Sequence, residues 1–251
     1  MMRRFWRQTS VIEQPGGWGV ALDGKPMKTP AKLDFICPAR ALAEAVAAEW
    51  AAVQDKIDAQ AMPLTQLCAT ALDIMPVKRA EIIGQIAAYA ETDLLCYRAE
   101  QAVDQIASGH YAPERESDRK KHESLAARQA EIWQPYLDWA LAQFDAMLKL
   151  TTSLRPIQQD EQALGALRRA VEALDDFRLA GLQQAVAVAG SLVLGLALVH
   201  GWRDASAIEA AAELDAHEQA ARWGADEEIT ARQISVRNDL AAVERFVRLL
   251  G

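Results

Sequence analysis

Ten consecutive residues, about one third of the way along the chain, concentrate side chains that can carry acid–base chemistry. Residues 89–98 read Tyr-Ala-Glu-Thr-Asp-Leu-Leu-Cys-Tyr-Arg and place the carboxylates of Glu91 and Asp93 close to the phenol of Tyr97 and the guanidinium of Arg98. In a helix, Asp93 and Tyr97 would be four residues apart on one face, so that acid and phenol lie side by side. Glu91, Asp93 and Tyr97 could then act as general acids and bases in an interdomain cleft.

The same four side chains also suit two roles without catalysis. Local capping together with an ion pair between Asp93 and Arg98 would make them structural. A contact with a partner protein is the other role. Because the chain mixes strand and helix patterns before this segment and is almost wholly helical after it, we expect the segment to fix how a β-containing part sits on a helical part.

A second row of polar and aromatic side chains indicates a binding surface. Asp215, Gln219 and Trp223 follow one another at steps of four, on one face of a predicted helix that ends at Gly224. Protein interfaces favour Trp with polar surroundings, so we predict that this row binds a partner. Trp50 is a further candidate: we expect its ring to pack in the core between sheet and helix, with a partner contact for its indole N–H as the alternative.

Two patterns that suggest a metal or a nucleotide do not hold on closer reading. Glu209, Glu213 and His217 recur at intervals of four, as metal ligands on a helix would, but no second helix carries a matching set, and a solvated acidic face gives the same pattern. The segment 19–25 has the glycine and lysine spacing of a phosphate-binding loop, but Pro26 follows where Ser or Thr is needed. We therefore predict no metal and no cofactor.

Composition excludes several classes of protein. The 251 residues are 51% hydrophobic, enough to bury a substantial core, and a net charge of −8 argues against binding to nucleic acid. Three widely spaced cysteines, Cys37, Cys68 and Cys96, indicate buried thiols in a reducing compartment. The longest uncharged apolar run, 185–199, is shorter than the ~20 residues that cross a bilayer, so we predict a buried helix and no membrane-embedded segment.

Residues 1–76 are predicted to form a small domain with an antiparallel sheet. Bulky residues alternate over 5–12 and 18–22, and Asp23-Gly24 suits a tight turn before a return strand over 25–29 that Pro26 confines to an edge. The meander ends near 35–37, and a helix that begins at Pro38 should lie on it.

Residues 77–251 are predicted to form a larger, mainly α-helical domain, which makes the fold class α+β. We expect one helix to include 185–199 and to close at Gly201, and another to run from Asp204 to Trp223. Pro135 should kink or split an aromatic-rich helix, part of whose aromatic set meets another element or another protein. The charged stretch 113–123 is expected to be solvated.

The ordered motifs of the chain resemble those of the assembly chaperones for the α subunit of the F-type ATP synthase catalytic head. Of the motifs that carry this resemblance, which span nearly the whole chain, the segment 89–98 is the most specific. The other matching residues are Arg4-Phe5-Trp6, Gly17-Trp18, Leu22-Asp23-Gly24-Lys25-Pro26, Thr29-Pro30, Ala48-Glu49-Trp50, Met62-Pro63-Leu64-Thr65, Gly190-Ser191-Leu192, Gln219 and Trp223-Gly224.

The resemblance implies a chaperone and not an enzyme. It implies a protein, monomeric when free, that holds the newly made α subunit, covers its β-facing surface and leaves when the head assembles, in the bacterial cytoplasm or the mitochondrial matrix. Family members carry acidic residues before the Gln and Trp-Gly; here Asp215 matches, whereas Ala216, His217 and Glu218 depart from that run. A helical adaptor with another client and an acid–base enzyme with an interdomain cleft are the alternatives.

Overall fold

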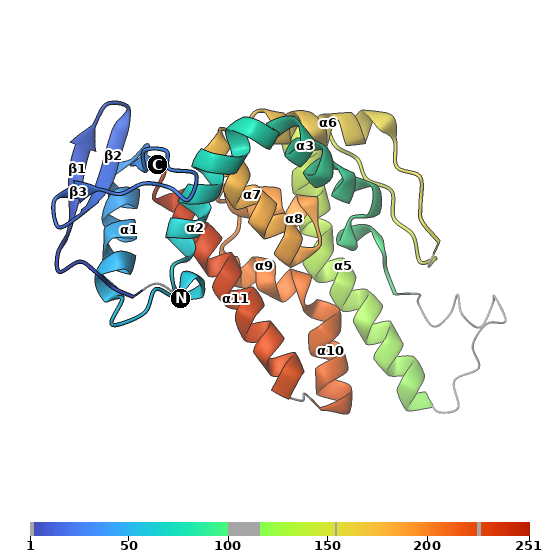
Figure 1. The fold of residues 1–251 in the computed structure, drawn as a ribbon. Helices are drawn as coiled ribbons and strands as arrows, with labels where there is room; N and C mark the ends of the chain where they lie inside the picture. The colour runs from blue at the N-terminus through green and yellow to red at the C-terminus, as the bar shows by residue number, and fades with distance from the viewer. Residues whose placement is uncertain (1–2, 100–115, 154, 225–226) are drawn as a thin grey trace.

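The computed structural model describes residues 3–99, 116–153, 155–224 and 227–251, and only the backbone of 116–124 and 221–223. The side chains of the whole charged stretch 113–123 are thus outside the described part, so the expectation that it is solvated stays a prediction. The described chain has the predicted α+β class, with a small antiparallel sheet first and helices after it (Figure 1).

The sheet is built around one central strand. Strand β2 pairs antiparallel with each of the other three, and the paired residues include Thr9 with Leu22 and Trp18 with Cys37. Asp23 and Gly24 have φ angles of 48° and 77°, which confirms the predicted tight turn. The strands are β1 (Thr9–Gln14), β2 (Gly17–Leu22), β3 (Lys25–Pro26) and β4 (Ile36–Cys37).

Two strands are shorter than predicted, each for a local reason. Strand β1 begins at Thr9 and not at Phe5, because the carboxylate of Asp23 accepts hydrogen bonds from the backbone N–H groups of Arg7 and Gln8, at 2.9 and 2.8 Å. Strand β3 ends at Pro26, a residue that confines it to an edge position, and the N–H of Met27 makes one further bond to the carbonyl of Val20, at 2.8 Å. Four of the six residues of β2 are buried.

Helix α1 (Arg40–Ala52) lies on the sheet, as predicted, and contacts β1 and β2. After α1 come the short turn η1 (Ala59–Ala61) and a break at Met62. From there α2 (Pro63–Ala69), the π-helical turn η2 (Thr70–Ile74) and α3 (Met75–Ala88) follow one another without a loop, across the expected domain boundary near Pro76. The division at residue 76 stays a prediction.

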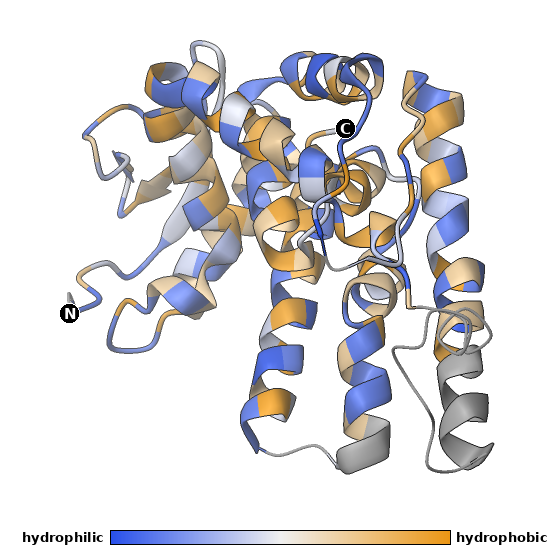
Figure 2. Ribbon diagram, turned by 90° about the vertical axis from the view of Figure 1, so that its right-hand side faces the viewer, coloured by the Kyte–Doolittle hydropathy of each residue, from blue (hydrophilic) through white to orange (hydrophobic). Residues whose placement is uncertain are grey.

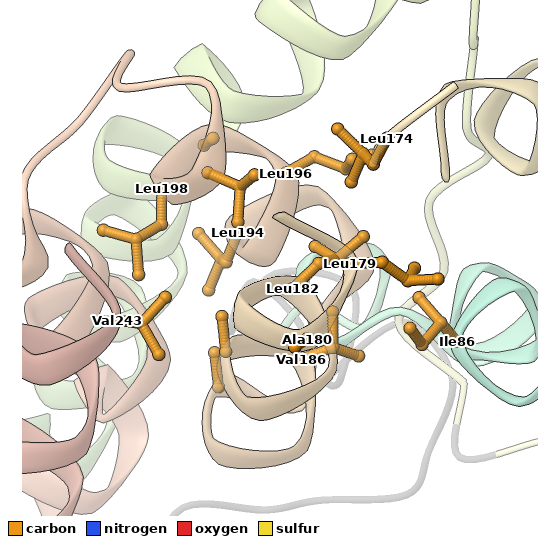
Figure 3. Packing of buried hydrophobic residues seen from close by; sticks show 14 of the residues in the cluster. Ile86, Leu174, Leu179, Ala180, Leu182, Val186, Leu194, Leu196, Leu198 and Val243 are labelled. Carbon is orange, nitrogen blue, oxygen red and sulfur yellow. The ribbon is translucent and has the colours of Figure 1, made fainter. Parts of the chain in front are cut away.

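The larger part of the chain packs around a central helix. Helix α8 is buried along its whole length and contacts α5, α7, α9 and α11, and Figure 3 shows its leucines against α7 and Val243. The elements of this part are η3 (Tyr89–Thr92), η4 (Leu94–Cys96), α5 (Glu116–Phe144), α6 (Glu161–Glu172), α7 (Asp176–Ala189), α8 (Leu192–Val199), α9 (Ala205–Ala212), α10 (Leu214–Trp223) and α11 (Glu227–Arg248).

Two predicted helices are each divided in two, so those predictions were wrong. The run 185–199 breaks because Gly190 takes a left-handed φ of 67° and the hydroxyl of Ser191 accepts a hydrogen bond from the N–H of Leu194, at 3.1 Å, starting α8 anew. The helix expected from Asp204 to Trp223 breaks at Glu213, which ends α9 and precedes α10.

Helix α5 is not split at Pro135, which lies inside one continuous helix. Its aromatic set meets another element, as predicted. The ring of Trp139 stacks on that of Trp202 with centroids 5.2 Å apart, and the hydroxyl of Tyr136 donates to the carbonyl of Ala207 at 3.0 Å. These contacts fix α5 against the α8–α9 connection.

Helices α5, α10 and α11 extend in the same direction from the body of the molecule (Figures 1 and 2). On the extending half of α11, Ile229 and Ile234 keep exposed side chains among charged neighbours. Among the described residues, no helix is both long and apolar enough to cross a membrane.

Candidate functional site

The segment 89–98 is not one helix, so the predicted pairing of Asp93 with Tyr97 was wrong. Two short 3₁₀ turns, η3 and η4, flank Asp93, whose backbone is extended with ψ of 132°. The chain changes direction at this residue and separates the acid from the phenol. Tyr97 instead pairs with Thr151 in a parallel β-bridge, and Glu91 is exposed.

Asp93 is a buried cap that ties the segment to the central helix. Its carboxylate is fully buried and accepts hydrogen bonds from the N–H groups of Leu95 and Val193, each at 3.1 Å, at the N-terminus of α8. Burial raises the pKa of Asp93, and hydrogen bonds from Ser191 and from the backbone oppose that rise. The capping role, which was one of the alternatives, is therefore present.

Arg98 makes no ion pair with Asp93, because the two side chains leave the segment toward different helices. Its guanidinium lies over the ring of Trp133 on α5, 5.1 Å from the centroid, and donates to the carbonyl of Gln129. Burial lowers the pKa of Arg98, and its Nε and Nη2 atoms have no hydrogen-bond partner among the described residues. These bonds lead to helices α5 and α8, and not to the sheet, which corrects the expected link to the β-containing part.

The four side chains do not point toward one common place: Asp93 faces the N-terminus of α8, Arg98 lies over Trp133 on α5, and Glu91 is exposed. Four cavities of about 380 to 550 Å³, the best formed of those lined by described residues, have none of Glu91, Asp93, Tyr97 and Arg98 in their walls. Proton transfer to a substrate needs a group within hydrogen-bond reach of it. The geometry of these residues therefore gives the acid–base hypothesis no support.

Gln129 joins the two predicted sites, and the sequence reasoning missed it. Its side chain, 2% exposed, donates to Oδ1 of Asp215 at 2.8 Å and accepts from the N–H of Ala99 at 2.7 Å, while its carbonyl accepts from Arg98. A polar residue four positions before the buried Trp133, on the apolar stripe of α5, is the pattern that could have indicated it.

Helix α10 holds all three residues of the predicted binding row. Asp215 is half-buried against α5, and Gln219, one turn later, is exposed. Trp223 is the last residue of α10, and its side chain lies outside the described part. Nearby, Trp133 donates its indole N–H to the carbonyl of Ala211 at 2.8 Å, which holds α5 against the end of α9.

The carboxylates of Glu209 and Glu213 face helix α11 and not a metal. Glu213, 2% exposed, accepts two hydrogen bonds from Arg232, at 2.9 and 3.1 Å. Glu209 Oε1 lies 3.5 Å from Nε2 of His217 and 3.6 Å from Nη2 of Arg237. Among the described residues no group of three or more His, Cys, Asp or Glu could hold a metal ion.

Trp50 packs as the sequence predicted, in an apolar cluster at the base of the sheet. Its ring is half-buried, 5.0 Å from the ring of Trp6, and it lines a cavity of about 380 Å³ together with Phe35 and Met62. Its indole N–H has no hydrogen-bond partner in the part of the chain that the structure describes. A partner contact at Trp50 therefore stays a prediction.

Fold and site together define a helix-rich α+β protein in which Asp93, Arg98 and Asp215 join neighbouring helices. The chain belongs to the ATP12 chaperone protein family, whose model matches residues 3–141. This confirms the sequence resemblance to chaperones of ATP synthase assembly.

Known relatives cover nearly the whole chain. The crystal structure of Atp12 from Paracoccus denitrificans has a TM-score of 0.86 and 38% identity, with 99% of this chain and 98% of that chain covered. Atu1473 from Agrobacterium tumefaciens has a TM-score of 0.85 and 31% identity, with coverage of 99% and 86%. The mitochondrial protein atp12 of Schizosaccharomyces pombe is 24% identical over 235 residues, which are 90% of this chain and 75% of that protein.

Proposed function

We propose that this chain binds the free α subunit of the F-type ATP synthase catalytic head, masks the surface that will meet the β subunit, and leaves when the head assembles. Membership of the ATP12 chaperone family supports the chaperone role. The observation that carries the location is the buried amide of Gln129, which holds the half-buried carboxylate of Asp215 at 2.8 Å beside the exposed Gln219. An acid fixed in this way is pre-organised for a partner.

The physical need for such a protein follows from the size of an obligate interface. A subunit that will later bury a large apolar surface exposes it beforehand and aggregates. A transient partner with a less favourable interface can cover that surface and then be displaced by the permanent one. The acidic charge of −8 and the exposed Gln219 beside the half-buried Asp215 on α10 suit such a reversible contact.

Co-expression with the α subunit tests this proposal. We expect α to become soluble and to purify with this protein in a one-to-one complex. Asp215→Lys should weaken binding at least ~10-fold, because a charge-reversed group would face the same partner atoms. Glu13→Lys changes an exposed residue of β1 by the same charge and should bind as the wild type does. An α subunit that stays insoluble would reject the proposed function. Binding by Asp215→Lys as tight as that of the wild type would reject the proposed site.

A competition measurement separates this proposal from an adaptor with another client. With labelled α subunit in the complex, unlabelled α should displace it, whereas unlabelled β subunit should not bind the chaperone. A preference for β or for neither subunit would favour the adaptor.

We place this activity in the cytoplasm of a bacterium or in the mitochondrial matrix, with the free chaperone monomeric and not catalytic. The mitochondrial name of the S. pombe relative and three free, buried cysteines support a reducing compartment of this kind. Light scattering on the free protein checks the monomer: a mass near 27.6 kDa is expected, and twice that mass would contradict it.

A further inference from the structure

Exposed apolar side chains gather where helix α5 ends and the chain turns toward α6. Within ten residues, Leu141, Met147 and Leu150 are 41%, 64% and 44% exposed. Leu141 and Met147 line a cavity of about 480 Å³ whose wall on the α6 side includes the buried Ala163. Exposed apolar side chains that gather beside a cavity are characteristic of binding surfaces.

Carboxylates border this cavity. Asp145, Asp160 and Glu161 all line it, and among the residues whose side chains are described only Asp160 of the three is paired with a cation, Nζ of Lys149, at 2.7 Å. Two net negative charges are therefore left beside the apolar side chains. Within the described chain the three acids do not form a group that could hold a metal ion, so a bound cation does not account for them.

The acidic side of the cavity has a strained backbone. Asp145 has a left-handed φ of 58° just after α5. Its N–H donates to the carbonyl of Leu141, and the N–H of Ala146 donates to the carbonyl of Ala140. Gly takes this helix-ending position at less cost than Asp does. The side chain that Asp keeps here accepts from Nε2 of Gln162 at 3.3 Å and so faces α6 across the cavity.

The segment that carries Met147 is held in place. Gln159, 5% exposed, accepts from the N–H of Lys149 at 2.8 Å and donates to its carbonyl at 3.0 Å. The backbone two residues after Met147 is therefore fixed, while the thioether itself stays adaptable. A fixed backbone with a flexible apolar tip reduces the entropy cost of docking.

We propose that this cavity, lined by Leu141, Asp145, Met147, Asp160 and Glu161, docks an aliphatic side chain flanked by Lys or Arg in a segment of the client protein. The apolar lining takes the aliphatic group, and the carboxylates of Asp145 and Glu161, which have no cationic partner among the described side chains, take the basic flanks. The assignment rests on the proposed function. Because Leu141 is twelve residues after Gln129 on α5, the site lies ~18 Å from the Asp215 contact along one helix.

Binding of the free α subunit to variants of the full chain tests this site. Met147→Asp should weaken binding ~10-fold, and Glu161→Lys several-fold with a weaker dependence on salt. Met147→Leu keeps an apolar side chain of similar size and should bind as the wild type does. Glu13→Lys, on strand β1 at the opposite side of the molecule (Figure 1), is the control for charge.

A photoreactive phenylalanine in place of Met147 identifies what enters the cavity. We expect it to crosslink to an aliphatic position of the α subunit within two residues of a Lys or Arg. Equal binding by the wild type, Met147→Asp and Glu161→Lys would overturn the site alone, as would a crosslink to an acidic segment. Failure of the wild type to bind α would overturn both this site and the proposed function.

Discussion

At the scale of single residues, the polar side chains that matter most are buried amides and acids that join helices. Gln129 touches three segments of the chain, and Asp93 caps the N-terminus of α8. Neither side chain is free to react with a solvent-borne substrate. Both act by fixing where neighbouring helices and exposed residues lie.

Gln129→Met should destabilise the fold by about 1–3 kcal/mol, because it leaves the N–H of Ala99 without its buried acceptor and releases Asp215. Urea unfolding measures the loss. Gln134→Met on the same helix removes only a side-chain bond to exposed Asp138 and should change stability by less than about 0.5 kcal/mol. Equal effects from the two variants would contradict the role given to Gln129.

Asp93 should make stability depend on pH in a direction that burial sets. Because its folded-state pKa is raised, the native state holds this proton more tightly than the unfolded chain does. Between the ordinary Asp pKa of about 4 and the raised value, stability should therefore fall as pH rises. Asp93→Asn removes that contribution, so the stability difference between wild type and variant should shrink as pH rises through this window. Unfolding curves in urea from pH 4 to 7 measure it, and parallel profiles would contradict the assignment.

At the scale of elements, the packing of α7 on α8 depends on one glycine. A Cβ at Gly195 would lie 2.6 Å from Cγ2 of Val186 and 3.0 Å from Cδ1 of Leu182. Gly195→Ala should therefore destabilise by about 1–3 kcal/mol. Gly84→Ala on α3 meets nothing within 4 Å and should be neutral or stabilise by up to about 1 kcal/mol. Thermal unfolding of both variants checks this, and a stabilised Gly195→Ala would show that the two helices can separate at little cost.

Sequence patterns predicted the elements better than the breaks between them. Alternation and the Asp23-Gly24 turn were enough for the sheet, because strand period and turn chemistry are local. The divisions at Gly190 and Glu213 were missed because the apolar pattern continues across both, and only the fold shows which carbonyls need a cap. The Gln129 contact was missed for a related reason: its partners are 30 and 86 residues away.

At the scale of the whole molecule, the sheet-containing part and the helical part share one apolar core. Leu64 and Met75, from α2 and α3, belong to the same cluster of buried side chains as Leu182 and Leu194, from α7 and α8. Helix α2 also contacts α7 and α11 directly. The chain before residue 76 contains the sheet and the chain after it is mainly helical. Because buried side chains of both parts belong to this cluster, unfolding either part alone would expose apolar surface of the other.

We accordingly expect the chain to unfold as one unit. In native-state hydrogen exchange, the most protected amides of β2 and those of α8 should open with the same free energy and the same dependence on urea, because loss of either part exposes the shared cluster. An opening of β2 that costs several kcal/mol less than that of α8 would contradict this and would restore two independent domains. Equal opening energies would instead mean that the sheet is held in place by the same buried cluster that holds α7 and α8.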